Sequence, residues 1–378
     1  MDRPLAPVSL RDLKDIDPYP AYERIREAGP VTWDEGMRAW LVVTHEGCTV
    51  VLRNEDRFAE PTGGLPDAER IVGRRDIRSL LGPQHETLHR AVSHAWRPGP
   101  IAPLADGAVR PLLGVRIAAV AARPTLELYD ELARLLPIAV ISRVLGLPDA
   151  EPADLDRAKT WMEAVLAWRH SYGEDPDARA AAVVATRQLE PFLRETVRAR
   201  RAAPTDDLIS LLWSVGPSIV PDWDEQDVID NAKFMYEGGS ETTAFLLTTA
   251  VHRLLEQPVA ERDRILAEPG RLESFIEEVL RHSTVTHLRA RRATEDVVID
   301  GVRIPAGDRV LAVTAAANRD PLRWERPEAI DPDRPRLRGH LAFDSQEVGK
   351  YGDGRAGYGA GHARQCCALP PSPHRANT

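Results

Sequence analysis

One long stretch with apolar flanks and a glycine-containing centre limits what this chain can fold into. The stretch from Asp224 to Gln257 follows Pro221 and ends before Pro258. With Asp222 or Asp224 as N-cap it has room for one helix of about nine turns. Its flanks are rich in Phe, Met, Leu, Val and Ala, which indicates burial, whereas its centre reads Gly238-Gly239-Ser240-Glu241-Thr242-Thr243. Glycine inside a helix is about 1 kcal/mol less favourable than alanine, and threonine hydroxyls compete for helix carbonyls, so this centre weakens its helix.

Two interpretations of this centre are open. In the first, a small ligand lies against the helix backbone at Gly238 and Gly239, while Glu241 and Thr242 supply a carboxylate and a hydroxyl for proton transfer. In the second, the glycines only let two helices pack closely, beside a solvated Glu241. The stretch by itself favours neither interpretation.

Helical patterns dominate the rest of the 378 residues, with a few short strands. Apolar periodicity and turn residues predict a fold that is mainly α with a small β portion, and the whole chain, 1–378, is expected to form a single domain. Glycine and charge dominate residues 61–75, which predicts a surface loop. Helices are expected at 21–27, 46–53, 83–96, 224–257 and 271–282 and repeatedly within 103–201, a hairpin at 31–33 and 39–44, and short strands within 286–314.

Composition excludes several classes of protein. No apolar run approaches the roughly 18 residues of a membrane helix, and the first ten residues lack the apolar core of a signal peptide. A net charge of −9 argues against general nucleic-acid binding. The three cysteines are too few for a disulfide framework and fit a reducing compartment, so a cytoplasmic location is expected. Nearly all basic residues are arginine, with only a few lysines.

Two pairs of polar residues fall at helical spacing. His85 and His89 are four residues apart, so they share a helix face. They could bind a metal, donate hydrogen bonds to a carboxylate of a ligand, or be solvated. Glu278 and Arg281 are three residues apart and can form an ion pair, which on an exposed face would contribute only a few tenths of a kcal/mol.

Together these motifs resemble a bacterial cytochrome P450, a haem-thiolate monooxygenase. The centre of the long helix resembles the family's oxygen-groove signature, Ala/Gly-Gly-x-Asp/Glu-Thr-Thr, and Glu278-Val279-Leu280-Arg281 resembles its Glu-x-x-Arg motif. The helix with His85 and His89 resembles one that binds haem propionates, with His89 where arginine is commoner. The resemblance covers residues 17 to about 343, including a strand and an irregular segment at Arg289-Ala290-Arg291-Arg292-Ala293-Thr294-Glu295-Asp296 and 317–334.

The resemblance implies roles for these residues. Glu241 would pass protons from solvent and Thr242 would present them to the reacting oxygen, so that O–O cleavage prevails over release of peroxide. Arg291 would bind a propionate, with Arg289 as the alternative in a two-residue slip. Glu278 and Arg281 would form a buried network with Arg334 from the irregular segment.

The resemblance also implies cofactors and partners. The cofactor would be haem b, with electrons from NAD(P)H delivered by a ferredoxin and a ferredoxin reductase. The segments that line substrate pockets in the family are rich in aromatic and aliphatic residues here, which suits a small apolar or aromatic substrate and a role in secondary metabolism. They are residues 61–77, 161–179, 234–237 and 285–288.

The end of the chain departs from the family pattern. The family's ligand loop reads Phe-Gly-x-Gly-x-His-x-Cys-x-Gly, and here Tyr358 and Gly359 begin a similar loop in which Cys366 arrives one residue late and no glycine follows it. Cys366 is expected to ligate the iron, with Cys367 second, and residues 344–378 are expected to be an atypical C-terminal segment. A zinc site built from His362, Cys366, Cys367 and His374 is a weaker alternative, because these spacings match no common zinc pattern.

The expected function is therefore a haem-dependent monooxygenase that inserts one atom of O2 into a small organic substrate. The alternative is a haem-deficient auxiliary or scaffold protein, or an inactive truncated product. A peroxide-driven enzyme is disfavoured by the intact Glu241–Thr242 pair.

Overall fold

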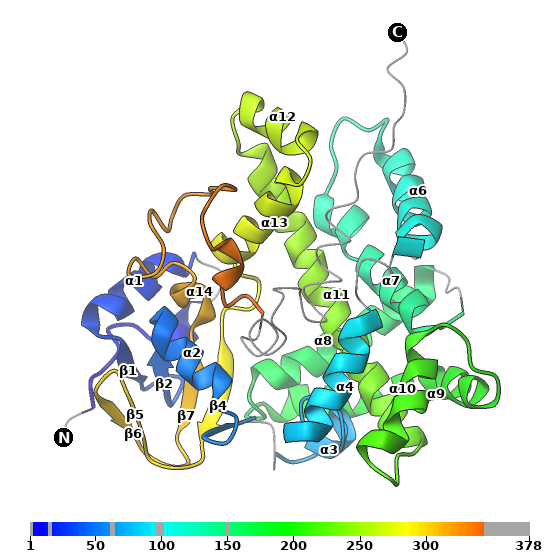
Figure 1. The fold of residues 1–378 in the computed structure, drawn as a ribbon, viewed down its shortest axis with the longest axis horizontal. Coiled ribbons are helices and arrows are strands. Elements are labelled where there is room, and N and C mark those ends of the chain that lie inside the picture. Colours follow the sequence, from blue (N-terminus) through cyan, green and yellow to red (C-terminus); the bar gives the residue numbers. More distant parts are fainter. Residues whose placement is uncertain are drawn as a thin grey trace. The chain divides into compact units, whose positions relative to one another are not determined.

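A computed structural model of the chain describes residues 3–13, 17–60, 65–95, 102–103, 105–148 and 152–343 (Figure 1). Its contacts group these residues into two compact units. The first unit takes residues up to 63 and from 257 onward, and the second takes residues 64–256. Within the described part of the chain, no helix has the length and apolarity needed to cross a membrane.

The first unit is built on a five-stranded mixed sheet in the order β1-β2-β7-β4-β3. Only the β2–β7 pair is parallel. A separate hairpin, β5–β6, turns at Asp300 and Gly301, both with positive φ. The strands are β1 (Val31–Asp34), β2 (Ala39–Val42), β3 (Phe58–Ala59), β4 (Arg289–Ala293), β5 (Val297–Ile299), β6 (Val302–Ile304) and β7 (Arg309–Ala312). The hairpin and the late strands expected from the sequence are confirmed.

Short helices pack on this sheet and enclose a core. Helix α2 contacts β7, and α14 contacts α2. Trp40, Phe58 and Val310 lie in this core together with Cys48, whose thiol donates to the carbonyl of Val42. Helices α12 and α13 pack on each other. The helices of the first unit are η1 (Leu10–Asp12), α1 (Tyr19–Ala28), α2 (His45–Arg53), α12 (Val259–Ala267), α13 (Arg271–His282), α14 (Thr314–Ala317) and η4 (Leu337–Gly339).

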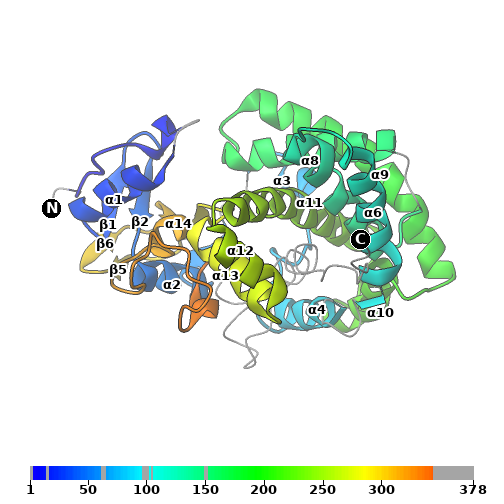
Figure 2. The same ribbon diagram turned by 90° about the horizontal axis from the view of Figure 1, so that it is seen from above.

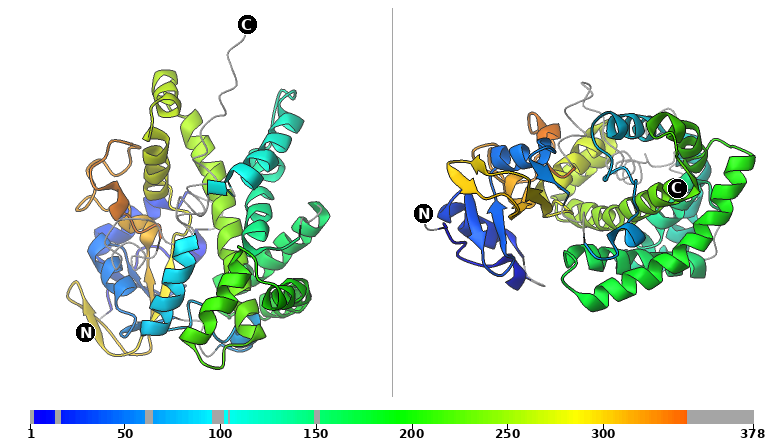
Figure 3. Two further views of the ribbon diagram at one scale, coloured as in Figure 1. Left: turned by 45° about the vertical axis from the view of Figure 1, so that its right-hand side comes forward. Right: turned by 90° about the horizontal axis from the view of Figure 1, so that it is seen from below.

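The second unit consists of helices arranged around the long helix α11, which contacts α7, α8, α9 and α10 (Figure 2). Helices α8 and α9 run side by side, and α10 also packs on α4 (Figure 3). The helices are α3 (Ala68–Ile71), α4 (Gly82–Ala95), η2 (Ala105–Val109), α6 (Arg110–Val120), η3 (Tyr129–Ala133), α7 (Leu136–Leu145), α8 (Pro152–His170), α9 (Pro176–Ala202), α10 (Leu208–Ile219) and α11 (Glu225–Leu255).

Helix α11 begins and ends where the sequence predicts. The Asp224 side chain accepts hydrogen bonds from the backbone of Gln226 and Asp227, and the Asp227 carboxylate accepts one from the backbone N–H of Asp224. This reciprocal arrangement is a capping box, which satisfies backbone donors that the first turn leaves without helical partners. Asp224, and not Asp222, is therefore the N-cap.

The expectation of a surface loop at residues 61–75 is partly wrong. Residues 68–71 form the single turn α3, whose Ala68 and Ile71 pack against Val165 and Trp168. The surrounding charges and glycines hid this apolar pair, which is three residues apart. Its packing in the tertiary structure, and not local propensity, makes this turn helical.

Candidate active site

The two glycines at the centre of α11 have different surroundings. A methyl group on Gly239 would lie 3.3 Å from the side chain of Ile141 on α7, so close helix packing accounts for this glycine. The carbonyl of Gly238 accepts a 2.7 Å hydrogen bond from the hydroxyl of Thr242, one turn later. Thr242 is exposed among the described residues. The packing interpretation therefore fits Gly239, and the close approach of a ligand at Gly238 remains a prediction.

Glu241 is held by two residues that the sequence reasoning missed. The Tyr129 hydroxyl, in η3, donates a 2.9 Å hydrogen bond to its Oε1 atom. The ammonium group of Lys159, on α8, forms an ion pair with its Oε2 atom. The Lys159 side chain is 0% exposed, whereas that of Glu241 is 18% exposed. The scarcity of lysine could have drawn attention to Lys159, but nothing in the sequence distinguishes Tyr129.

The ammonium group of Lys159 titrates in an unusual range. Burial lowers its pKa to about 8, and Arg134 lowers it further, while Glu163 opposes the shift. The Glu163 carboxylate lies 3.7 Å from the Lys159 Nζ atom, one turn along α8, and its side chain is 44% exposed. A connected set of ionisable groups thus leads from the surface of α8 to Glu241.

A second ion-paired carboxylate lies one turn before Glu241. Glu237 is buried and pairs with Arg169 of α8 and, at 3.8 Å, with Arg78. The Arg78 guanidinium also pairs with Asp76 and lies 4.5 Å above the ring of Phe234. The segment expected to line a substrate pocket, 234–237, is therefore partly charged.

A small cavity of about 10 Å3 lies behind this segment. Its size suits about one water molecule. Lys233 and Glu237 supply charged groups to its wall, which is otherwise mostly apolar and formed by Ile71, Val72, Met162, Val165, Thr186, Leu189 and Phe234.

His85 and His89 lie beside each other on α4, as their spacing predicts. Their ring centroids are 5.6 Å apart, and His89 is 7% exposed. Two adjacent imidazoles can both donate hydrogen bonds to a carboxylate.

The two candidate arginines of β4 point to different partners. The Arg291 guanidinium lies 3.7 Å from the carboxylate of Glu60 and is 14% exposed. The Arg289 guanidinium reaches the carbonyl of Ala342 at 3.4 Å.

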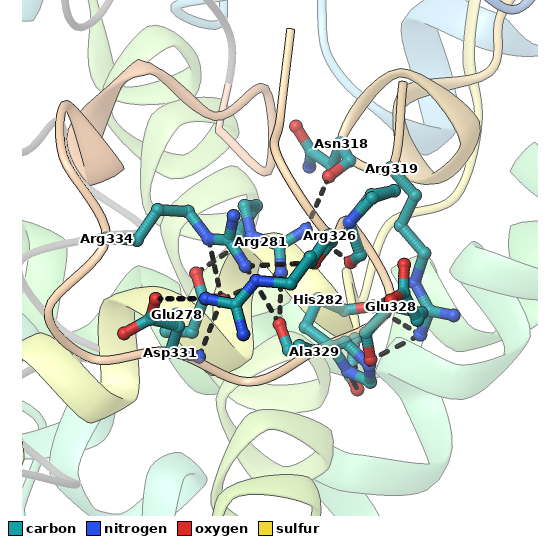
Figure 4. Close-up of polar contacts among 12 residues, drawn as sticks. Glu278, Arg281, His282, Asn318, Arg319, Arg326, Glu328, Ala329, Asp331 and Arg334 are labelled. Carbon is teal, nitrogen blue, oxygen red and sulfur yellow. Dashed lines mark hydrogen bonds and ion pairs between the residues drawn. The ribbon is translucent and has the colours of Figure 1, made fainter. Parts of the chain in front are cut away.

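Glu278, Arg281 and Arg334 come together in the first unit (Figure 4). Arg281 donates two hydrogen bonds to the Glu278 carboxylate, from Nε at 2.8 Å and from Nη2 at 2.7 Å. Arg334 donates from Nε to the same carboxylate at 2.9 Å. Both side chains of the Glu278–Arg281 pair are 0% exposed. The pair is therefore no surface ion pair, and the fourth contact to the carboxylate comes from the backbone N–H of Asp331.

The same network fixes the irregular segment after α14. Arg281 donates to the carbonyls of Asn318, Pro327 and Ala329 at 2.8 to 2.9 Å. Arg334 shares the carbonyl of Ala329 at 3.0 Å. Two guanidinium groups thus join helix α13 to the irregular segment from Asn318 to Arg334.

The donors present suit a haem. The paired imidazoles of His85 and His89 and the guanidinium of Arg291 are the kinds of group that bind carboxylates such as haem propionates. Tyr358, Gly359 and Cys366 lie outside the described residues, as do the members of the alternative zinc site. Within the described ranges, no three His, Cys, Asp or Glu residues cluster as metal ligands would.

Comparisons with known proteins agree with this reading of the fold. The family model of cytochrome P450 matches residues 271–351. Cytochrome P450 monooxygenase PikC of Streptomyces venezuelae is 31% identical over 86% of this chain and 77% of its own length. Erythromycin C-12 hydroxylase of Saccharopolyspora erythraea is 30% identical over 82% of this chain and 76% of its own length. Among solved structures, P450BioI has a TM-score of 0.80 at 23% identity over 95% of this chain and 90% of that one. CYP109E1 of Bacillus megaterium has a TM-score of 0.78 at 24% identity over 93% and 89%.

Helices of this arrangement with a small mixed sheet define a P450-like fold. The chain belongs to the cytochrome P450 family. Its activity class is accordingly that of a haem monooxygenase, an oxidoreductase that receives its electrons from outside the chain.

Proposed function

We propose that this chain hydroxylates, or similarly oxidises, a small organic molecule, with Glu241 and Thr242 as its proton-transfer pair. The observation that carries the proposal is the geometry at the centre of α11. There the Thr242 hydroxyl is exposed and bonded only to the Gly238 carbonyl among the contacts described, beside a carboxylate held by Lys159 and Tyr129.

The cofactor would be haem b, whose thiolate-ligated iron supplies the dioxygen chemistry when bound. His85, His89 and Arg291 would hold its propionates, and Cys366 would supply the thiolate. Arg289 is the alternative to Arg291.

The residues of α11 would hold and move protons. A threonine hydroxyl can donate one hydrogen bond and accept others. Thr242 could therefore turn its proton from the Gly238 carbonyl toward a reacting oxygen. Glu241 would then return a proton to this hydroxyl. The buried ion pair with Lys159 and the bond from Tyr129 fix the carboxylate of Glu241 and limit its side-chain motion.

The electrons would come from NAD(P)H through a ferredoxin and a ferredoxin reductase, in the cytoplasm. This part of the proposal follows from membership of the family. The Glu278, Arg281 and Arg334 network would keep the segment before the ligand loop in place.

The substrate would be a small apolar or aromatic compound of secondary metabolism. Support comes from the named relative that hydroxylates erythromycin at C-12 and from the similar structure in complex with testosterone. Glu237, in the segment expected to line the substrate pocket, is buried and ion-paired with Arg78 and Arg169. These charged groups would suit a substrate that also carries polar groups.

Thr242→Ala tests this function, with Thr242→Ser as the matched control that keeps the hydroxyl. Electrons are supplied by a plant-type ferredoxin and its reductase, and the hydrogen peroxide released is compared with the O2 consumed. Thr242→Ala is expected to raise the peroxide share, because proton delivery is impaired, whereas Thr242→Ser stays close to wild type. An equal peroxide share in all three proteins would contradict the role of Thr242.

A further inference from the structure

The chain uses lysine very sparingly, and the two lysines that the structure describes are both buried. Only four of its 49 basic residues are lysine, and Lys159 and Lys233 are 0% and 5% exposed. Lysine and arginine differ in their chemistry, because arginine stays protonated in proteins whereas a buried lysine can lose its proton. A lysine in a buried ion pair of such an arginine-rich chain therefore marks a position where proton exchange is possible.

The two buried lysines have different surroundings. Each lysine pairs with two carboxylates, and for Lys233 these are Glu190 at 2.9 Å and Asp230 at 3.0 Å. For Lys159 they are Glu241, the neighbour of Thr242, and Glu163 at 3.7 Å, whose side chain is 44% exposed, so that only Lys159 connects the centre of α11 with a carboxylate at the surface.

We propose that Lys159 is the proton carrier that connects solvent to Glu241, with Glu163 as the entry group on the surface of α8. This proposal rests on the proposed function of Glu241 and Thr242. In the first step the N–H bond of the Lys159 ammonium breaks and an O–H bond forms on Glu241, which leaves a neutral amine beside a neutral carboxylic acid. Glu241 passes this proton to Thr242. Lys159 then takes a proton from solvent through Glu163, so that one proton enters for each proton delivered.

The surroundings of Lys159 support exchange over permanent pairing. The groups that interact with it are Glu163 on its own helix, Glu241 on α11 and Arg134 at the C-cap of η3. Arg134 itself pairs with Asp156, and Tyr129 bonds the other oxygen of the Glu241 carboxylate. Burial and the positive Arg134 both lower the pKa of Lys159, to about 8. A proton carrier works best with a pKa near the working pH, and an unperturbed lysine would hold its proton too tightly.

The first test measures protonation directly. With four lysines in the chain, labelling the lysine ε-carbon with 13C gives at most four signals, which can be followed by NMR in the diamagnetic ferrous carbon monoxide form. The signal lost in Lys159→Met is expected to titrate near pH 8. It should titrate at lower pH in Glu163→Gln, because a negative neighbour that raises the pKa is gone. A Lys159 signal that stays charged up to pH 10 would overturn the proposal.

The second test measures proton delivery. The ratio of peroxide released to O2 consumed is followed against pH, with a plant-type ferredoxin and its reductase as electron source. In wild type the peroxide share should rise as the pH rises through about 8. In Lys159→Met the peroxide share should be high at every pH. The formation of water, which requires proton delivery and O–O cleavage, should be about 10²-fold slower, because a positioned acid typically contributes at least that factor. Lys159→Arg should not restore water formation, although it keeps the charge.

Glu163→Gln keeps the test valid if the variants of buried residues fold poorly. Its matched control is Asp154→Asn, because Asp154 is another acid on α8 and pairs only with Arg157 among the described ion pairs. Glu163→Gln should raise the peroxide share and Asp154→Asn should not. Equal behaviour of these two variants would overturn the role of Glu163. If Thr242→Ala responds and Lys159→Met does not, Lys159 carries no protons and the proposed function stands; if Thr242→Ala does not respond, the proposed function itself is wrong.

Discussion

Replacing Arg281 by methionine should destabilise the protein strongly. In the folded chain Arg281 donates two hydrogen bonds to Glu278 and three to the carbonyls of Asn318, Pro327 and Ala329. Both charged groups are 0% exposed. Methionine fills part of the volume but leaves the Glu278 carboxylate with Arg334 and one backbone N–H as its donors. Removal of one partner of a buried ion pair lowers the free energy of unfolding by about 3–5 kcal/mol.

This loss would take up much of the roughly 5–15 kcal/mol that stabilises a typical folded protein. Urea unfolding followed by far-UV circular dichroism measures it as a lower midpoint at an unchanged slope. Arg264→Met is the matched control, because Arg264 and Glu261 form an ion pair at the same spacing in the same unit, with Arg264 53% exposed. It should change stability by less than about 1 kcal/mol. Equal stability losses in the two variants would refute the reasoning.

Three further predictions concern other parts of the fold. Gly73→Ala should lower stability by about 1–3 kcal/mol in urea unfolding, because Gly73 has φ +108° and a methyl group would lie 2.5 Å from Asp230. His89→Leu should speed haem transfer to apomyoglobin about fivefold, the effect of one lost hydrogen bond of about 1 kcal/mol, whereas the 64% exposed His252 replaced by leucine should not. Asp207→Ala removes the N-cap of α10 and should lower stability by about 1–2 kcal/mol at pH 7.

The effect of Asp207 should depend on pH in a defined direction. Burial alone would raise the pKa of its carboxyl, but hydrogen bonds from Thr205, Arg200 and Ser210 outweigh burial and lower it. A lowered pKa in the folded state gives stability that is present above the ordinary pKa of 3.8 and is lost as the pH falls toward the folded value. The difference between wild type and Asp207→Ala should therefore shrink below about pH 4, and a difference that is constant with pH would contradict this cause.

The sequence predicted the elements whose signals are local. The prolines and the capping aspartate fixed the ends of α11, and the hairpin at β1 and β2 followed from its turn residues. The pair His85 and His89 and the pair Glu278 and Arg281 followed from helical spacing, because side chains three or four residues apart share a face. The single domain and the roles of the site residues remain predictions.

The contacts between distant segments could not be predicted in this way. Helical spacing says which residues share a face but not what covers that face. Lys159 and Tyr129 were therefore missed as partners of Glu241, because they lie 82 and 112 positions away in the chain. The turn α3 was missed because Ala68 and Ile71 are held in a helical turn by their packing on α8 and α9, and not by local sequence preference. The packing role of Gly239 likewise became visible only with Ile141 of α7 beside it.

The absorption spectrum of the dithionite-reduced protein under carbon monoxide tests the central claim most directly. If this chain is a working haem-thiolate monooxygenase, with Cys366 or Cys367 bound to the iron, the Soret band will show the red shift of thiolate ligation. The band should be lost in the double variant with both cysteines replaced by serine. A spectrum without a haem band, or with a band typical of histidine ligation, would contradict the proposal that this chain, as its sequence stands, activates dioxygen.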